Sequence, residues 1–271
     1  MSPLHQVLAI AGKEFRDRIR NRWVLVVALV FTVFSLAIAL LGGAQQGALG
    51  LRSTEATISS LVSLVIYLIP LIALLLGFDA VVGERERGSL DLLLALPLSR
   101  GELLLGKYLG LAAAMVLSTL AGFAVVAVLM ARQLGGNGLW HYLGFMLSAA
   151  LLGLAFLSLA VACSVLARDR TRASGLAIAL WFFFVLVFDL LLLGVLVGSG
   201  GRAGGAWFPY LLLANPADVF RILNVFSLDD VRTLSGLGGL VPASLANPWL
   251  MGSAMVAWIA APLALARWRF R

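Results

Sequence analysis

Six long apolar runs constrain this chain more than any other feature of its sequence. A helix of about twenty apolar residues crosses the ~30 Å hydrocarbon core of a bilayer. We expect transmembrane helices at 23–41, 58–78, 103–130, 140–166, 173–197 and 249–265. Only 12% of the 271 residues are charged, which is about half the share found in soluble domains. The sequence therefore predicts an all-α membrane protein with one transmembrane domain over 1–271, and it excludes a soluble globular fold.

Basic residues gather on one side of these six spans. Fifteen of the twenty Lys and Arg lie before the first span, between the second and third spans, after the fourth span and at the C-terminus. Cytoplasmic segments of membrane proteins carry such an excess. We therefore expect both termini in the cytoplasm and the chain in the bacterial inner membrane. The same placement explains the net charge of +7 without a nucleic-acid partner.

The segment 4–22 is expected to form an amphipathic helix that lies in the membrane interface. Its apolar residues recur at helical spacing: Leu4, Val7, Leu8, Ala11, Phe15 and Ile19. An alternative is a helix packed on a soluble partner. The Arg-rich end leads straight into the first span, which favours contact with lipid.

The longest connection, 198–248, is expected on the outer face. It is too long for an unstructured loop in a compact unit, so we expect it to contain helices of its own. Its polar residues and prolines, such as Pro209, Asn215 and Asp218, argue against a seventh span. A partly re-entrant hairpin is the alternative.

The segment 83–100 is predicted to form a short cytoplasmic helix followed by a sharp turn. Ser89 is expected to cap a helix over 90–96, and Pro97 ends it. Ser99 then begins the helix of the third span, and Glu102 three residues later completes a capping box.

The short helix has an apolar side formed by Leu90, Leu93 and Leu94, beside the charged run 84–87. That combination suits insertion into a groove on a partner protein. The alternative is an interfacial loop that returns the chain to the bilayer.

The segment 83–100 resembles the type-2 ABC-transporter permease family, with its signature E-R-E-x-G-[ST]-L-[ED]-x-L-L-x-x-P-[LIV]-[ST]-R/P. The matching residues are Glu84, Arg85, Glu86, Gly88, Ser89, Leu90, Asp91, Leu92, Leu93, Pro97, Ser99 and Arg100, followed by Gly106, Lys107 and Tyr108. The resemblance implies a coupling helix that touches a separate ATPase, a homodimer, and ATP and Mg²⁺ bound on that partner. The implied coupling residues are Glu84, Arg85, Glu86, Arg87, Gly88, Ser89, Leu90, Asp91, Leu93, Leu94, Pro97, Ser99 and Arg100.

Two further stretches, 67–79 and 215–221, resemble the permeases that serve nitrous oxide reductase maturation. That narrower resemblance implies a periplasmic partner protein and a role in supplying copper or sulfur to the reductase. The alternative within the family is an exporter of a drug, a peptide or an ion.

The sequence supports no catalytic, cofactor or metal site on this chain. Residues 101–107 fit the spacing of a phosphate-binding loop, but Tyr108 stands where Mg²⁺ binding needs Ser or Thr, and the segment is typical of a helix. A membrane-embedded enzyme would need clustered catalytic groups, which the spans lack. We see no convincing metal-ligand cluster among Cys163, the two histidines and the methionines.

Two carboxylates near or inside the spans are functional candidates. Asp189 lies within the fifth span and faces either a lumen or partner protomer, or else water near the outer end. Asp79 ends the second span, where contact with water or with Arg85 is expected.

Overall fold

The computed structural model describes residues 3–41, 54–95, 97–133, 135–200, 207–225, 245 and 247–270. Within these ranges the regular structure is entirely helical. Six helices are long and apolar enough to cross a membrane. The prediction of an all-α protein with six spans is therefore confirmed.

The spans begin and end close to the predicted residues. Four of the six are the uninterrupted helices α2 (Trp23–Leu41), α3 (Thr54–Gly77), α6 (Arg100–Gln133) and α7 (Gly135–Leu166). The sixth is α12 (Pro248–Arg269). The fifth consists of α8 (Arg170–Phe182), the π-helical turn η2 (Phe183–Val187) and α9 (Phe188–Gly198).

The fourth span is the centre of the bundle. In its apolar 18-residue stretch, 78% of the residues are buried within the chain, against 17% for the corresponding stretch of the fifth span and 22% for that of the sixth. Helix α7 packs against α3, α6 and α12. The aromatic rings of Phe123, Phe145 and Phe220 contact one another in sequence and join α6, α7 and α10. The weakly buried fifth and sixth spans therefore offer most of their surface to lipid or to another protein.

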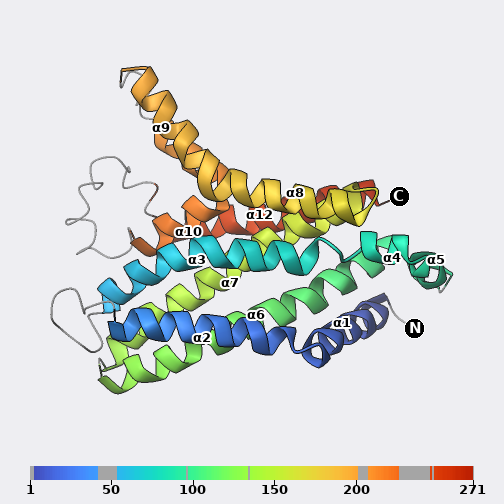
Figure 1. Cartoon of the computed structure of the whole chain (residues 1–271), viewed down its shortest axis with the longest axis horizontal. Coiled ribbons are helices and arrows are strands. Elements are labelled where there is room, and N and C mark those ends of the chain that lie inside the picture. Colours follow the sequence, from blue (N-terminus) through green and yellow to red (C-terminus); the bar gives the residue numbers. More distant parts are fainter. Residues whose placement is uncertain are drawn as a thin grey trace.

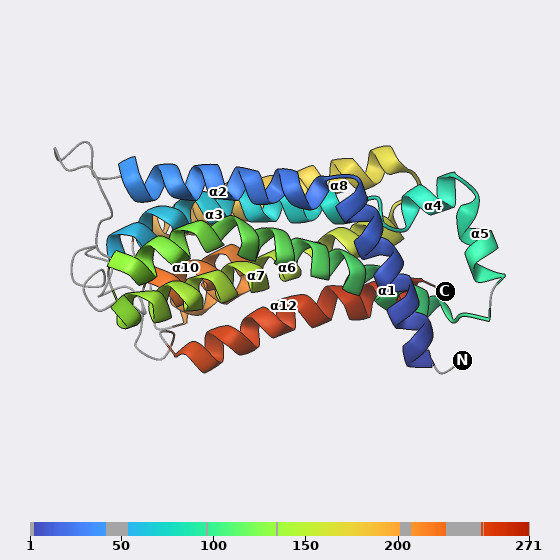
Figure 2. The same cartoon turned by 90° about the horizontal axis from the view of Figure 1, so that it is seen from below.

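The N-terminal helix α1 (Pro3–Arg20) lies steeply across the bundle and packs on α6 (Figure 2). Two glycines of α6 permit this close approach. A Cβ atom at Gly106 would lie 2.7 Å from the Cβ of Ile10, and one at Gly110 would lie 2.5 Å from the carbonyl of Ala11. Leu4 and Leu8 remain exposed, which leaves an apolar face of α1 for the membrane interface.

Both termini lie at the same end of the bundle (Figure 1). The short helices α4 (Val82–Glu86) and α5 (Ser89–Leu94) lie at that end as well. At the other end, α9 leans away from the bundle, and none of its residues is buried.

The segment 198–248 contains helices of its own. They are the 3₁₀ helix η3 (Phe208–Ala214) and α10 (Pro216–Val225). Helix α10 packs against α3, α7 and α12. Residues 201–206, 226–244 and 246 lie outside the described residues, so the alternative of a re-entrant hairpin stays untested there.

Candidate coupling site

The turn between α4 and α5 depends on Gly88, which has a left-handed backbone with φ of +71°. Gly88 occupies the N-cap position of α5, and Ser89 is the first helical residue. The predicted Ser89 cap is therefore wrong. The Ser89 hydroxyl instead donates to the carbonyl of Glu84 at 3.3 Å. Glycine is favoured at Gly88 because a side chain there would strain the left-handed conformation.

Helix α5 ends at Leu94, with Ala95 as its C-cap, two residues before the predicted end. The predicted capping box that follows is confirmed. The backbone N–H of Ser99 donates to Glu102 at 2.7 Å, and the N–H of Glu102 donates to the Ser99 hydroxyl at 3.2 Å. Helix α6 therefore begins at Arg100, with its first turn fixed by side chains.

The leucines of α5 do not all face outward. Leu90 is buried, and Leu93 and Leu94 are half-buried against the chain's own core. Leu92 is 74% exposed. The prediction that Leu90, Leu93 and Leu94 form a free apolar face is therefore wrong for Leu90. The surface left for a partner consists of Leu92 with the exposed Asp91.

Several hydrogen bonds tie α4 to the turn between α7 and α8. The Ser164 hydroxyl accepts from the backbone N–H groups of Val81 and Val82 at 2.9 and 3.0 Å. Arg85 donates to the carbonyl of Ala167 at 2.8 Å, and Glu86 accepts from the backbone N–H of Arg170 at 2.8 Å. A displacement of α4 would therefore reach the start of the fifth span.

Asp79 joins the same connection. Its carboxylate accepts from Arg170 at 2.6 Å. Of the two contacts expected for Asp79, water or Arg85, the one with Arg85 is not formed, because Arg85 is engaged with the α7–α8 turn. An ion pair therefore fixes the end of the second span to the start of the fifth.

A buried lysine of α6, Lys107, links this helix to α1 and α4. The ammonium of Lys107 lies 2.7 Å from Glu14 of α1 and 2.7 Å from Glu84 of α4. The Lys107 side chain is 3% exposed, and the two glutamates are 11% and 10% exposed. A buried charge is tolerated only when it is paired and hydrogen-bonded. Lys107 therefore holds α1 and α4 to the third span.

The remaining predicted residues lie at the edge of this cluster. Arg87 is exposed and donates to the carbonyl of Gly83 at 2.9 Å. The carbonyl of Pro97 accepts from Gln6 of α1 at 3.0 Å. The guanidinium of Arg100 lies 5.8 Å from the ring centroid of Phe270. The predicted segment is therefore brought together with both ends of the chain.

A second polar cluster lies at the opposite end of the bundle and includes Asp189. Arg221 of α10 lies 3.0 Å from Asp189 and 2.6 Å from Asp218. Asn215 donates to the carbonyl of Phe184 at 2.8 Å, within the π-helical turn. Arg221 thus places a cation beside Asp189. Asn215, which directly precedes α10, anchors the bend of the fifth span.

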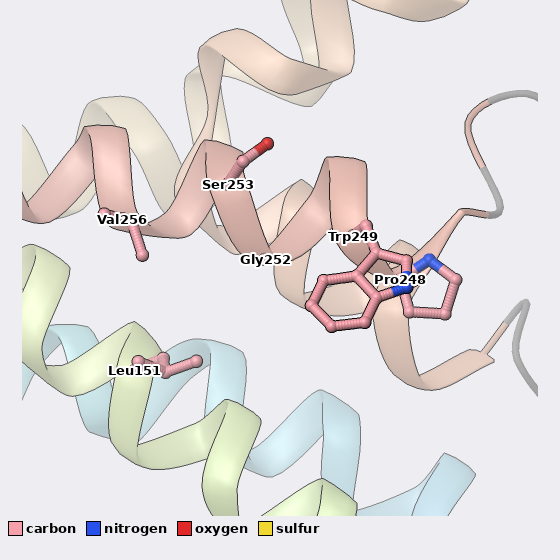
Figure 3. Close-up of a pocket in the computed structure, with 6 residues that line it drawn as sticks. All are labelled: Leu151, Pro248, Trp249, Gly252, Ser253 and Val256. Carbon is pink, nitrogen blue, oxygen red and sulfur yellow. The ribbon is translucent and has the colours of Figure 1, made fainter.

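An apolar groove of about 620 Å³ lies between α7 and α12 (Figure 3). Leu151 lines one side, and Pro248, Trp249, Gly252, Ser253 and Val256 line the other. The Ser253 hydroxyl donates to the carbonyl of Leu250. The groove therefore resembles a lipid-facing surface more than a site for a polar solute.

The phosphate-loop-like segment 101–108 lies inside α6, where the Tyr108 hydroxyl donates to the carbonyl of Leu154. Among the described residues, no group of three His, Cys, Asp or Glu side chains is arranged for a metal.

The ion pairs of these two clusters were not predicted from the sequence. Lys107 lay within the matched signature but had no assigned partner, and Glu14 lies 93 residues away from it. Arg170 and Arg221 were counted only for orientation. Charged residues next to or inside apolar runs were the available signal.

Comparison with known proteins covers nearly the whole chain. A family model described as ABC-2 family transporter protein matches residues 8–271. The chain is 44% identical over 275 residues to a Stutzerimonas stutzeri protein named probable ABC transporter permease protein NosY, with 99% of each chain covered. It is 45% identical over 280 residues to a protein of the same name from Pseudomonas aeruginosa, with 98% of each chain covered. The likeness therefore includes α4, α5 and the segment 198–248 as well as the spans.

Proposed function

This chain belongs to the ABC-2 family of transporter proteins, and we propose that it couples ATP hydrolysis on a separate subunit to work across the bacterial inner membrane. It is a multi-pass membrane permease of the NosY type and is not itself catalytic by family. In the proposed transporter, two copies of this chain assemble with two copies of a NosF-like ATPase, and the ATPase subunits bind ATP and Mg²⁺. Both termini of this chain lie in the cytoplasm.

One observation carries the proposal. Helix α5 presents an exposed face at the end of the bundle, while the residues that precede it contact α6, α7 and α8. Leu92 supplies exposed apolar surface. Glu84 contacts Lys107 of α6, and Glu86 contacts the first residue of α8. A push on α5 would therefore be transmitted to the third and fifth spans together.

The proposed mechanism needs two arrangements of the spans with different affinities for the closed ATPase pair. ATP binding closes the ATPases and moves α5, which biases the membrane domain toward one arrangement. Hydrolysis then releases that bias. The hydrogen bonds of α4 make the movement a rigid-body shift of packed helices rather than a local unfolding.

Co-purification tests the proposal most simply. The chain is expressed with its own operon, solubilised in mild detergent and isolated by a tag on its C-terminus. We expect one ATPase subunit for each permease chain, with ATP hydrolysis that depends on that subunit. Isolation of the chain without any ATPase, under conditions that keep the bundle folded, would contradict the proposal.

The narrower proposal concerns the purpose of the transport. Both relatives are named as NosY permeases, which supports a role in supplying copper or sulfur for nitrous oxide reductase maturation, with a NosD-like protein as the periplasmic partner. Deletion of the gene is expected to leave the reductase without functional copper sites. A deletion strain with fully metallated reductase would end this narrower proposal and leave the broader one intact.

A further inference from the structure

A polar cleft of about 360 Å³ lies between α1, α4 and α6. Its volume is within the range of pockets that hold small ligands. Its acidic lining residues are Glu14, Asp17, Asp79 and Glu84, and its basic ones are Lys13, Arg18, Arg87 and Lys107. The cleft therefore contains both signs of charge rather than one.

Two buried carboxylate oxygens in the lining lack a hydrogen-bond donor among the described residues. They are one oxygen of Glu84 and one oxygen of Asp79. The Glu84 side chain is 10% exposed, and its other oxygen contacts Lys107. A buried oxygen without a donor costs free energy comparable to a lost hydrogen bond. A ligand that donates N–H groups would remove this cost after a rotation of either side chain toward the cleft, because both oxygens are inaccessible in the present conformation.

Three basic side chains of the same lining form no ion pair among the residues that the structure describes. They are Lys13 and Arg18 of α1 and Arg87, which follows α4. Lys and Arg bind phosphate through short, charge-assisted hydrogen bonds. The cleft thus offers donors for an anion beside acceptors for a cation.

The position of the cleft indicates where such a ligand comes from. Helix α1 leaves Leu4 and Leu8 exposed, as expected for a helix in the membrane interface. The cleft lies beside it, at the end of the bundle that carries both termini. In the proposed orientation that end meets the inner leaflet, so lipid headgroups are the nearest zwitterionic groups.

We propose that this cleft binds the headgroup of one phosphatidylethanolamine molecule. The phosphate lies against Lys13, Arg18 and Arg87, and the primary ammonium lies toward Asp79 and Glu84. Phosphatidylcholine carries the same charges but has no N–H to donate, and phosphatidylglycerol has no cation. The proposal rests on the proposed orientation of the chain, and it does not require the ATPase.

Native mass spectrometry of the full chain without the ATPase tests the proposal. The chain is purified in detergent with equal amounts of phosphatidylethanolamine, phosphatidylcholine and phosphatidylglycerol. We expect one tightly retained phosphatidylethanolamine. The double variant Lys13→Gln/Arg18→Gln should retain it about tenfold less, because two charge-assisted contacts are lost.

The matched control is Arg16→Gln/Arg20→Gln, which removes two exposed charges of α1 that do not line the cleft. It should retain the lipid as the native chain does. Equal retention of all three lipids, or unchanged retention by Lys13→Gln/Arg18→Gln, would overturn the proposal. ATPase co-purification is a separate readout, so failure of the lipid site leaves the proposed function standing.

Discussion

At the scale of single residues, Lys107 is a buried cation at the meeting point of three helices, α1, α4 and α6. It serves two glutamates from different elements and is 3% exposed. Removing one partner of a buried charge group leaves the others uncompensated. The structure therefore assigns Lys107 the role of holding α1 and α4 to α6.

We expect Lys107→Met to destabilise the folded chain by about 3–5 kcal/mol, the usual cost of breaking a buried pair. Thermal unfolding in detergent measures this as a lower midpoint. The matched control is Glu14→Gln/Lys107→Met/Glu84→Gln, which removes all three charges and should recover much of the loss. Equal midpoints for native and Lys107→Met chains would show that the buried charges are not coupled.

Asp218 gives a prediction about pH. It lies in α10, which is not one of the six spans. Burial raises the pKa of Asp218 to about 7, with a further increase from Asp189 and an opposing decrease from Arg221. Because the folded state prefers the protonated form, this group stabilises the fold at low pH, and that contribution is lost as pH rises through about 7.

The native chain should therefore unfold at lower temperature at pH 8 than at pH 5. Asp218→Asn, which stays neutral, should show a smaller change over the same interval. Thermal unfolding of both chains at several pH values measures the difference. Parallel curves for the two chains would contradict the raised pKa.

At the scale of elements, α5 separates its buried leucines from an exposed one. Leu90 faces the chain's own core, whereas Leu92 is 74% exposed. A few buried apolar side chains dominate the energy of most protein interfaces. Leu92 is thus the side chain of α5 best placed to enter a groove on the ATPase.

We expect Leu92→Asp to reduce recovery of the ATPase at least tenfold, because truncating or charging an interface anchor costs about 2 kcal/mol or more. Leu92→Met keeps an apolar contact and should retain the ATPase. Thermal unfolding should be unchanged in both variants, since the side chain is exposed. Full recovery of the ATPase with Leu92→Asp would place the contact elsewhere.

The bend of the fifth span is a second element with a defined cause. A π-helical turn widens the helix at Phe183–Val187, and Asn215 donates to the carbonyl of Phe184 within it. Polar groups that insert at such turns are common causes of helix kinks. The contact fixes the direction in which α9 leaves the bundle.

Asn215→Ala is expected to increase hydrogen exchange in Phe188–Gly198, because the bend loses its anchor on α10. Mass spectrometry of exchange in detergent measures this. Asn224→Ala is the control, since Asn224 is buried like Asn215 but lies within α10 and bonds to Ser148 of α7, whereas Asn215 directly precedes α10. An equal effect of both substitutions would mean that α10 as a whole had loosened.

At the scale of the whole molecule, hydropathy and short-range spacing were sufficient to predict the spans and the capping box at Ser99 and Glu102. Both depend on neighbours a few residues apart. The outcome for Leu90 was not predictable, because a leucine face has the same spacing whether it packs on its own chain or on a partner. The Asp79 pair with Arg170 joins residues 91 positions apart, and such pairs depend on how the helices pack.

The whole molecule is accordingly a bundle whose two ends have different polar clusters. The end with both termini connects α1, α4, α6 and α8 through Lys107 and Arg170. The opposite end connects α9 and α10 through Arg221. In the proposed function the first cluster receives force from the ATPase, and the second holds the outer half of the fifth span.

The most direct test is an electron-microscopy map of the permease assembled with its ATPase and ATP. The account predicts two permease chains, with α5 of each seated in a groove of one ATPase and Leu92 buried there. A map in which α5 contacts lipid or water alone would contradict the coupling role, whatever else the particle contained.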